Sequence, residues 1–168
     1  MTLALRPGRV VDIFRLQEIE RAAAELFRDS GLIDVSKMSV ITMGDHIGSI
    51  DEGLSLVAEM EGRVVGFAMG EMHDENAYLR ELDVDPVFQK RGAGAALVKA
   101  FAEAARARHA TVAYLSTFRA PRWNAPFYRK QGFRDVARTD YMPWMQAIEY
   151  EQSKFLDIDT RVFMRLKL

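Results

Sequence analysis

Residues 79–98 read LRELDVDPVFQKRGAGAALV, and this stretch decides the fold. Its first part continues an apolar-rich run over residues 77–84 that stops at Asp85 and Pro86. Proline lacks the N–H group that a strand needs for its hydrogen bonds, so the run predicts a strand that ends at this point. Downstream, apolar side chains recur at helical spacing on one face, at Leu97, Ala100, Phe101, Ala104 and Ala105. The stretch therefore predicts a strand, a glycine-containing turn and a helix.

The turn between that strand and that helix has the composition of an anion-binding loop. Gly92 and Gly94 let the backbone approach a ligand, and the unpaired N–H groups at the start of a helix over 92–108 favour a negative charge. Lys90 and Arg91 add two positive charges. No Gly-Lys-Ser/Thr follows, which excludes a Walker A loop, and a strand meander precedes the turn where a dinucleotide fold would have a β-α-β unit.

The flanking patterns predict a mixed α/β (α+β) fold with a largely antiparallel central sheet flanked by helices. A helix is expected after Asp12 and ends at Ser30-Gly31, and Glu61-Gly62 is a two-residue hairpin signal. Further strands are expected over 54–60, 63–72, 111–117, 133–139 and 160–168, and a short helix over 124–131. Residues 31–53 read as a short helix or a loop, and residues 140–159 carry too much aromatic area for a simple linker.

The composition limits the number of domains and the kinds of partner. With 168 residues, 49% of them hydrophobic, the chain is long enough for one core, so we expect a single domain over residues 1–168. Its 23 basic and 24 acidic side chains give a net charge of -1, which argues against binding of nucleic acid or of an anionic membrane. No apolar stretch reaches the roughly 18 residues of a membrane span, and the start is unlike a signal peptide, so the cytoplasm is the expected location.

The rarer residue types exclude several kinds of chemistry. The chain has no cysteine, which excludes disulfides, thiolate zinc sites and a cysteine nucleophile. The three histidines, His46, His73 and His109, are too scattered to predict a metal site, so we expect none. We expect them to be surface residues or satisfied partners, and His46 is the one that could line a substrate pocket.

Two motifs resemble those of the GNAT superfamily of acyl-CoA-dependent N-acyltransferases. The family signature, Gln or Arg, two residues, Gly, one residue, and Gly or Ala, is met by Gln89, Gly92 and Gly94. A second family element, a short helix with an aromatic residue before Gly-Phe, is matched by NAPFYRKQGF at residues 124–133. The resemblance implies a sheet splayed at the cofactor-binding strands and acetyl-CoA as co-substrate without a metal. It also implies acetyl transfer to a primary amine by direct attack in a ternary complex.

The resemblance also implies which residues hold coenzyme A. The pyrophosphate is expected on the loop that starts the helix, and the pantetheine arm beside the preceding strand. The implied cofactor residues are Leu82, Asp83, Val84, Gln89, Lys90, Arg91, Gly92, Ala93, Gly94, Ala95, Asn124 and Phe127. Asn124 departs from the family pattern, whose asparagine lies about a turn earlier, where this chain has Pro121, so a role as a helix cap is the alternative.

For the chemistry, the resemblance points to Tyr128 as the acid for the leaving thiolate, either by full proton transfer or through a hydrogen bond. The alternative is a half-buried tyrosine that only packs beside Phe127. Glu81 is the candidate general base, with Asp83 on the same side of the strand. Glu71, a chain of water molecules, or a solvated strand face without a catalytic role are the other interpretations.

The expected acceptor is a small-molecule amine, because Tyr141, Trp144 and Tyr150 could form a lid over the site. These aromatic residues fit a homodimer interface or an ordinary core edge equally well. An N-terminal or lysine acetyltransferase acting on proteins is a second hypothesis, and a coenzyme A sensor without turnover is a third. A basic cluster over residues 119–134, around Trp123, could bind nucleic acid, but service to the cofactor's 3′-phosphate or plain solvation fits a net charge of -1 better.

Overall fold

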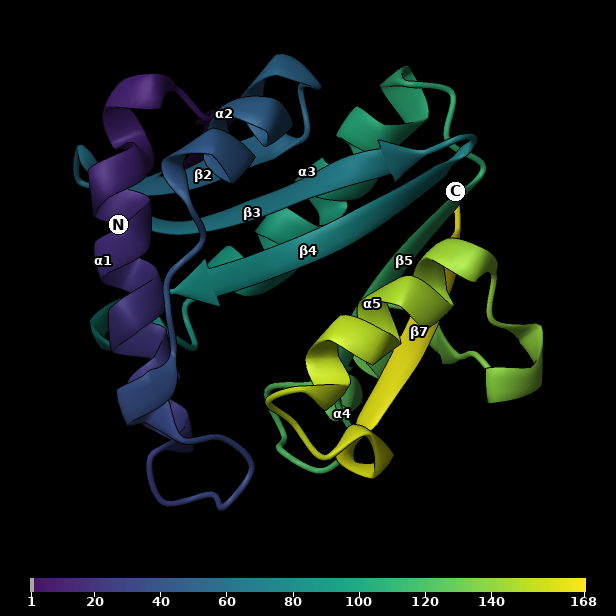
Figure 1. Ribbon diagram of the computed structural model, residues 1–168. Coiled ribbons are helices and arrows are strands. Elements are labelled where there is room, and N and C mark those ends of the chain that lie inside the picture. The colour runs from purple at the N-terminus through teal and green to yellow at the C-terminus, as the bar shows by residue number, and fades with distance from the viewer. Residues whose placement is uncertain (1) are drawn as a thin grey trace.

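A computed structural model describes residues 2–168 (Figure 1). Its centre is a seven-stranded sheet with the order β1-β2-β3-β4-β5-β7-β6. The strands are β1 (Leu3–Pro7), β2 (Ser55–Met60), β3 (Arg63–His73), β4 (Asn76–Val84), β5 (Val112–Phe118), β6 (Arg134–Asp135) and β7 (Arg161–Lys167). Neighbouring strands are antiparallel except β4 and β5, which run parallel. The expected mixed α/β fold with a largely antiparallel sheet is confirmed.

Helices cover both faces of the sheet (Figure 1). They are α1 (Ile13–Ala24), α2 (Met43–Asp51), α3 (Ala93–Ala107), α4 (Ala125–Lys130) and α5 (Pro143–Ser153). On one face, Leu97 and Phe101 of α3 are buried in the largest core cluster. On the opposite face, α1 buries Leu16 and Ile19 over β2 and β3, and α5 buries Met145 over β4, β5 and β7. Among the described helices, none is long and apolar enough to span a membrane.

Turn chemistry explains why most expected elements form where the sequence predicts them. Glu61 and Gly62 adopt φ of 53° and 73° at the β2–β3 hairpin, which are the positive values that a two-residue turn requires. Gly92 has a φ of 88° immediately before α3, and Gly132 has a φ of 95° just beyond α4. Each of these three glycines relieves the steric penalty that another residue would meet there.

Four elements differ from the expectation or go beyond it. The strand expected over 133–139 is wrong in length: β6 spans only Arg134–Asp135, followed by one hydrogen bond from the Val136 N–H to the Phe163 carbonyl at 2.8 Å, and residues 138–140 then turn into a 3-10 helix. The edge strand β1 has only five residues, and the sequence analysis did not predict it, although Pro7-Gly8 at its end is a turn signal. Within 31–53 the helix α2 forms, and its N-cap Thr42 accepts a hydrogen bond from the Asp45 N–H at 3.1 Å. The unassigned segment 140–159 contains α5.

The sheet splits between β4 and β5. Their parallel pairing ends at Leu79 and Leu115, although both strands continue beyond this point. At the same level β4 bulges, because Arg80 has no partner in the ladder with β3. Residues 81–84 therefore keep β3 as a neighbour but have no strand on their other edge. The expected splay at these strands is confirmed.

Candidate active site

The loop before α3 forms a backbone cradle at the end of β4. Lys90 and Gly92 both have positive φ, 61° and 88°, and α3 begins directly afterwards at Ala93. The Gln89 side chain donates a hydrogen bond to the Val84 carbonyl at 3.2 Å, which ties the loop to the strand. The first N–H groups of this 15-residue helix have no partner within the helix, and its dipole places partial positive charge there. The cradle is suited to a phosphate group.

The short helix α4 lies against this cradle. A Cβ atom on Gly94 would be 3.5 Å from the Phe127 ring, which is an ordinary van der Waals distance, so the start of α3 and α4 lie close together here. Asn124 precedes α4, but its side chain makes no capping hydrogen bond, so the cap interpretation is wrong. Its Nδ2 donates to Thr117 Oγ1 of β5 at 2.9 Å, while its Oδ1 is buried without a partner. A buried acceptor without a donor is costly, and a ligand donor would satisfy it.

These features fit the coenzyme A that the resemblance implies. The cradle offers N–H groups to a pyrophosphate, and the open edge of β4 offers backbone groups of Leu82, Asp83 and Val84 to an extended arm. The Asn124 oxygen offers one further acceptor beside them. Within residues 2–168, no three His, Asp or Glu side chains are grouped as ligands for a metal ion.

On the opposite face, three carboxylates lie near enough for their charges to act on one another, without being grouped as metal ligands, and we call them the carboxylate cluster: Glu20, Glu81 and Asp83. Glu81 and Asp83 both lie in the C-terminal half of β4, and because they are two residues apart their side chains are on the same face of the sheet. Burial raises the pKa of Glu81, and the positive charge of Arg161 opposes this rise. The pKa of Asp83 is raised further, by burial and then by the charges of Glu81 and Glu20. The three carboxylates therefore titrate as a coupled group, and each favours its protonated form more than an exposed carboxylate does.

Glu20 is a member that the sequence analysis missed. It lies on α1, only 7% exposed, and its two carboxylate oxygens accept the Ile41 N–H at 3.0 and 3.1 Å. Burial, and next the charge of Glu81, raise its pKa to about 7. A signal did exist, because Glu20 occurs at helical spacing from the buried Leu16 and Ala23, on the apolar side of the helix.

Tyr128 lies beside the carboxylate cluster and is 8% exposed. Burial raises its pKa above the ordinary value, and the charges of Glu81 and Asp83 raise it further, so the phenol holds its proton firmly. Its ring packs edge-on against Phe127 at 5.0 Å, as the packing interpretation expected. The hydroxyl makes no hydrogen bond to the described residues and is not among the enclosed polar atoms, which leaves it accessible to a ligand.

A second residue missed by the sequence analysis is Arg161, the first residue of β7. Its Nη2 donates to the Ser116 carbonyl at 3.0 Å and to the Ser116 hydroxyl at 3.2 Å. Its guanidinium lies 4.4 Å from the centre of the Phe118 ring. Its charge acts on Glu81 and Tyr128, which places it in the same region. No local motif signals this residue, because only the pairing of β5 with β7 brings it there.

The structure corrects the expectation for His46 and shows the contacts of several other candidates. His46 is fully buried and both ring nitrogens lack a partner, so it is neither a surface residue nor a satisfied one, and burial lowers its pKa. Glu71 accepts a hydrogen bond from His73 at 2.9 Å, and the His73 ring stacks on Trp144 at 4.4 Å. Trp144 thereby packs on the sheet surface. Within the basic cluster, Arg129 is paired with Asp135 at 2.8 Å.

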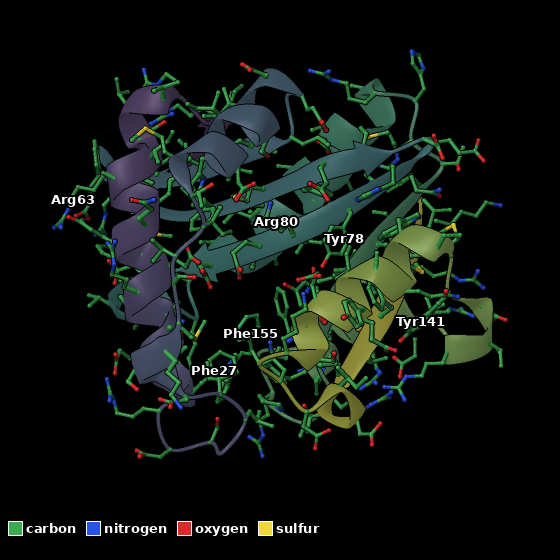
Figure 2. All side chains as sticks on the ribbon, viewed as in Figure 1. Phe27, Arg63, Tyr78, Arg80, Tyr141 and Phe155 are labelled. Atoms are coloured by element: carbon green, nitrogen blue, oxygen red, sulfur yellow. The ribbon has the colours of Figure 1, made fainter. Side chains whose placement is uncertain are left out.

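The region between α1 and α5 is visible in Figure 2. Tyr78 and Arg80 lie on the sheet surface between these helices, and Phe27 and Phe155 lie near their lower ends. Burial raises the pKa of Tyr78 to about 12, so it is a neutral phenol. Arg80 pairs with Asp45 of α2 at 3.1 Å. Phe155 is 83% exposed, whereas Tyr141 is buried beneath α5.

The buried Glu20 makes the stability depend on pH. Its pKa of about 7 in the fold exceeds the ordinary 4.5, so the native state keeps a proton that the unfolded chain releases, and stability falls as the pH rises through this interval. Glu20→Gln still accepts the Ile41 N–H but carries no charge. We expect it to exceed the wild type in unfolding free energy at pH 8 by up to about 3 kcal/mol, at about 1.4 kcal/mol per pKa unit.

Urea denaturation at pH 5 and at pH 8 measures this effect, and the gain should shrink at pH 5. Glu18→Gln is the matched control, because Glu18 is on the exposed side of the same helix, 63% exposed and paired with Arg15. Surface pairs contribute little, so this variant should follow the wild type at both pH values. The same pH dependence in both variants would contradict the buried position of Glu20.

Comparison with known proteins agrees with this geometry. The model of the acetyltransferase (GNAT) family matches residues 16–133. Among solved structures, the chain is similar to Ard1 from Thermoplasma volcanium at 20% identity, with a TM-score of 0.70 over 100% of this chain and 99% of that chain. It is also similar to the ribosomal-protein-S18-alanine N-acetyltransferase from Escherichia coli at 16% identity, with a TM-score of 0.68 over 99% of this chain and 94% of that chain.

A third similar structure is N-acetylglutamate synthase from Neisseria gonorrhoeae, complexed with coenzyme A and N-acetyl-glutamate. The identity is 14% and the TM-score 0.74, over 100% of this chain but only 35% of that chain. At these identities the three structures share the fold, and their names include a protein substrate as well as a small molecule. The family model, in contrast, matches more than half of the sequence. The chain therefore belongs to the GNAT acetyltransferase family, whose enzymes use acetyl-CoA as the acetyl donor.

Proposed function

We propose that the chain is an N-acetyltransferase that moves the acetyl group of acetyl-CoA to a primary amine of a small molecule, by direct attack in a ternary complex. The observation that carries this proposal is the split between β4 and β5. It connects the phosphate-binding cradle on the α3 side with the carboxylate cluster on the α1 and α5 side. α1 and α5 lie on either side of the C-terminal part of β4 (Figure 1), the strand that carries Glu81 and Asp83, and this favours a small acceptor over an extended peptide.

The proposed cofactor residues are those of the cradle, the open strand edge and α4. They comprise Leu82, Asp83, Val84, Gln89, Lys90, Arg91, Gly92, Ala93, Gly94, Ala95, Asn124 and Phe127. The N–H groups at the start of α3 would hold the pyrophosphate, and the unpaired edge of β4 would hold the pantetheine arm. Bound acetyl-CoA supplies an acetyl thioester that an amine can attack.

Two side chains are proposed to assist the attack. Glu81 accepts the proton that an ammonium must lose, since its raised pKa makes it a stronger base than an exposed glutamate. The amine nitrogen then bonds to the acetyl carbon while the carbon–sulfur bond breaks. Tyr128 donates a hydrogen bond to the leaving sulfur, and the second proton of the nitrogen passes through water to that sulfur. Because burial raises the pKa of Tyr128, a hydrogen bond is favoured over full proton transfer from the phenol.

A substitution in the cradle tests the cofactor site. Gly92→Ala would place a methyl group where the phosphate is proposed to lie, at a φ of 88°. We expect acetyl-CoA to bind at least about tenfold more weakly, since each 1.4 kcal/mol is worth a factor of ten. Gly31→Ala is the matched control, because Gly31 also has a positive φ, 71°, and open space around it, but lies outside the cradle. Calorimetry on both variants measures the difference, and equal affinities would contradict the site.

The experiment that tests the function combines binding with turnover. Calorimetric titration with acetyl-CoA and with dephospho-CoA would be followed by thiol release against a panel of amines and of N-terminal and lysine peptides. We expect acetyl-CoA to bind and thiol to be released with small amines. Absence of binding would overturn the proposal, release with peptides only would favour a protein acetyltransferase, and binding without any release would favour a coenzyme A sensor.

A further inference from the structure

Arg161 is a partly buried cation without an acidic partner. Three arginines of residues 2–168 are partly buried: Arg6, Arg15 and Arg161. Arg6 pairs with Asp12 at 2.8 Å, and Arg15 pairs with Asp85 at 2.6 Å. Arg161 has no carboxylate within ion-pair distance among the described residues, and its Nε is buried without any hydrogen-bond partner. Its recorded hydrogen bonds are the two from Nη2 to Ser116.

A partly buried guanidinium without a carboxylate partner is stabilised by an anion. Removing a charged group from water is unfavourable unless an opposite charge and hydrogen bonds replace the lost water. The hydroxyl and the carbonyl of Ser116 are neutral acceptors and occupy only one of the three nitrogens. A guanidinium presents its donors in a planar fork, which matches the two oxygens of a carboxylate. A carboxylate on a ligand would therefore complete the surroundings of Arg161.

The position of Arg161 connects it with the proposed acetyl transfer. By strand alternation it is on the same face of β7 as Phe163, which packs beneath α5. Glu81 and Tyr128 are close enough for their charges to act on Arg161, although neither forms an ion pair with it. The carboxylate cluster thus lies towards α1, and the cation lies towards α5. A ligand that spans this region meets negative charge at one end and positive charge at the other.

We propose that the acetyl acceptor is a zwitterion, an amino acid whose ammonium group faces Glu81 and Asp83 while its carboxylate binds the guanidinium of Arg161. This inference rests on the proposed function, and it narrows the small-molecule amine to one that also carries a carboxylate. Arg161 is then a specificity residue. The Phe118 ring beneath the guanidinium is only 5% exposed, and its centre lies 5.4 Å from that of the Phe27 ring, so aromatic side chains border the charge.

Matched pairs of an amino acid and its decarboxylated amine test the inference without any variant. Phenylalanine with phenethylamine, leucine with isopentylamine, and ornithine with putrescine would be compared by thiol release with acetyl-CoA. We expect at least one amino acid to exceed its amine in kcat/KM by at least about tenfold, as for a charge-assisted hydrogen bond. Amines that equal or exceed every amino acid would overturn this inference and leave the proposed function intact. No transfer to any amine would instead overturn the proposed function, and this inference with it.

A variant series then assigns the preference to the guanidinium. Arg161→Gln removes a charge that also acts on Glu81, so kcat/KM falls for both members of a pair, but it should fall about 10- to 100-fold more for the preferred amino acid than for its amine. Arg165→Gln is the matched control, since Arg165 is exposed on the same face of β7. Arg161→Lys keeps the positive charge but lacks the planar pair of donors of a guanidinium. It serves as the second variant if Arg161→Gln does not fold. Equal losses for both members of a pair would overturn the role of Arg161.

Discussion

Tyr128→Phe is expected to lower kcat about 10- to 100-fold while the affinity for acetyl-CoA stays the same, which is the size of effect that a hydrogen bond to a charged group provides. The substitution removes only the hydroxyl, which makes no hydrogen bond within the described residues. The ring keeps its packing against Phe127 at 5.0 Å and Phe133 at 5.8 Å. The thiolate would then leave without a donor nearby, so the loss should appear in the chemical step and not in binding.

Tyr114→Phe is the control for this variant. Tyr114 is also buried, 8% exposed, but its ring packs under α5 at 5.6 Å from Trp144. Steady-state rates of thiol release and calorimetric titrations with acetyl-CoA would be measured for both variants. A Tyr128→Phe enzyme that turns over at the rate of the wild type would leave Tyr128 with a packing role only, which is the alternative that the sequence left open.

Glu81→Gln is expected to lower kcat/KM by at least about 100-fold, within the range that general base catalysis contributes. The amide cannot accept the proton of the ammonium, and it is nearly the same size as the carboxylate. In the wild type, kcat/KM should rise with pH through a pKa above the ordinary 4.5 of a glutamate, because burial favours the protonated form of Glu81. Asp83 and Glu20 share protons with Glu81, so the profile belongs to the carboxylate cluster as a unit.

A second substitution separates the candidate bases. Glu71→Gln is the control, because Glu71 is the other strand carboxylate that could serve, and it is engaged with His73 at 2.9 Å. We expect this variant to retain most of the activity of the wild type. A larger loss in Glu71→Gln than in Glu81→Gln would move the base to β3. An unchanged rate in both variants would favour a chain of water molecules.

The part of the site that the sequence determines is local. Gln89, Gly92 and Gly94 specify the cradle, because a positive φ and a helix start depend on residues next to one another in the chain. The same holds for the β2–β3 hairpin at Glu61-Gly62. Tyr128 and Glu81 could also be predicted from the sequence. Tyr128 belongs to a family motif, and Glu81 belongs to the strand that leads into the cradle.

The acceptor region depends on contacts between distant segments, which only the tertiary structure decides. Glu20 comes from α1 and Arg161 from β7, and neither has a motif of its own. β1 forms because β2 offers it a partner, and the strand expected over 133–139 shortens because α5 follows so soon. The split between β4 and β5 depends on where two strands stop sharing hydrogen bonds. Strand pairing and the burial of charged side chains depend on residues that are distant in the sequence and adjacent in the fold. The pKa and the hydrogen bonds of a side chain are determined by these spatial neighbours.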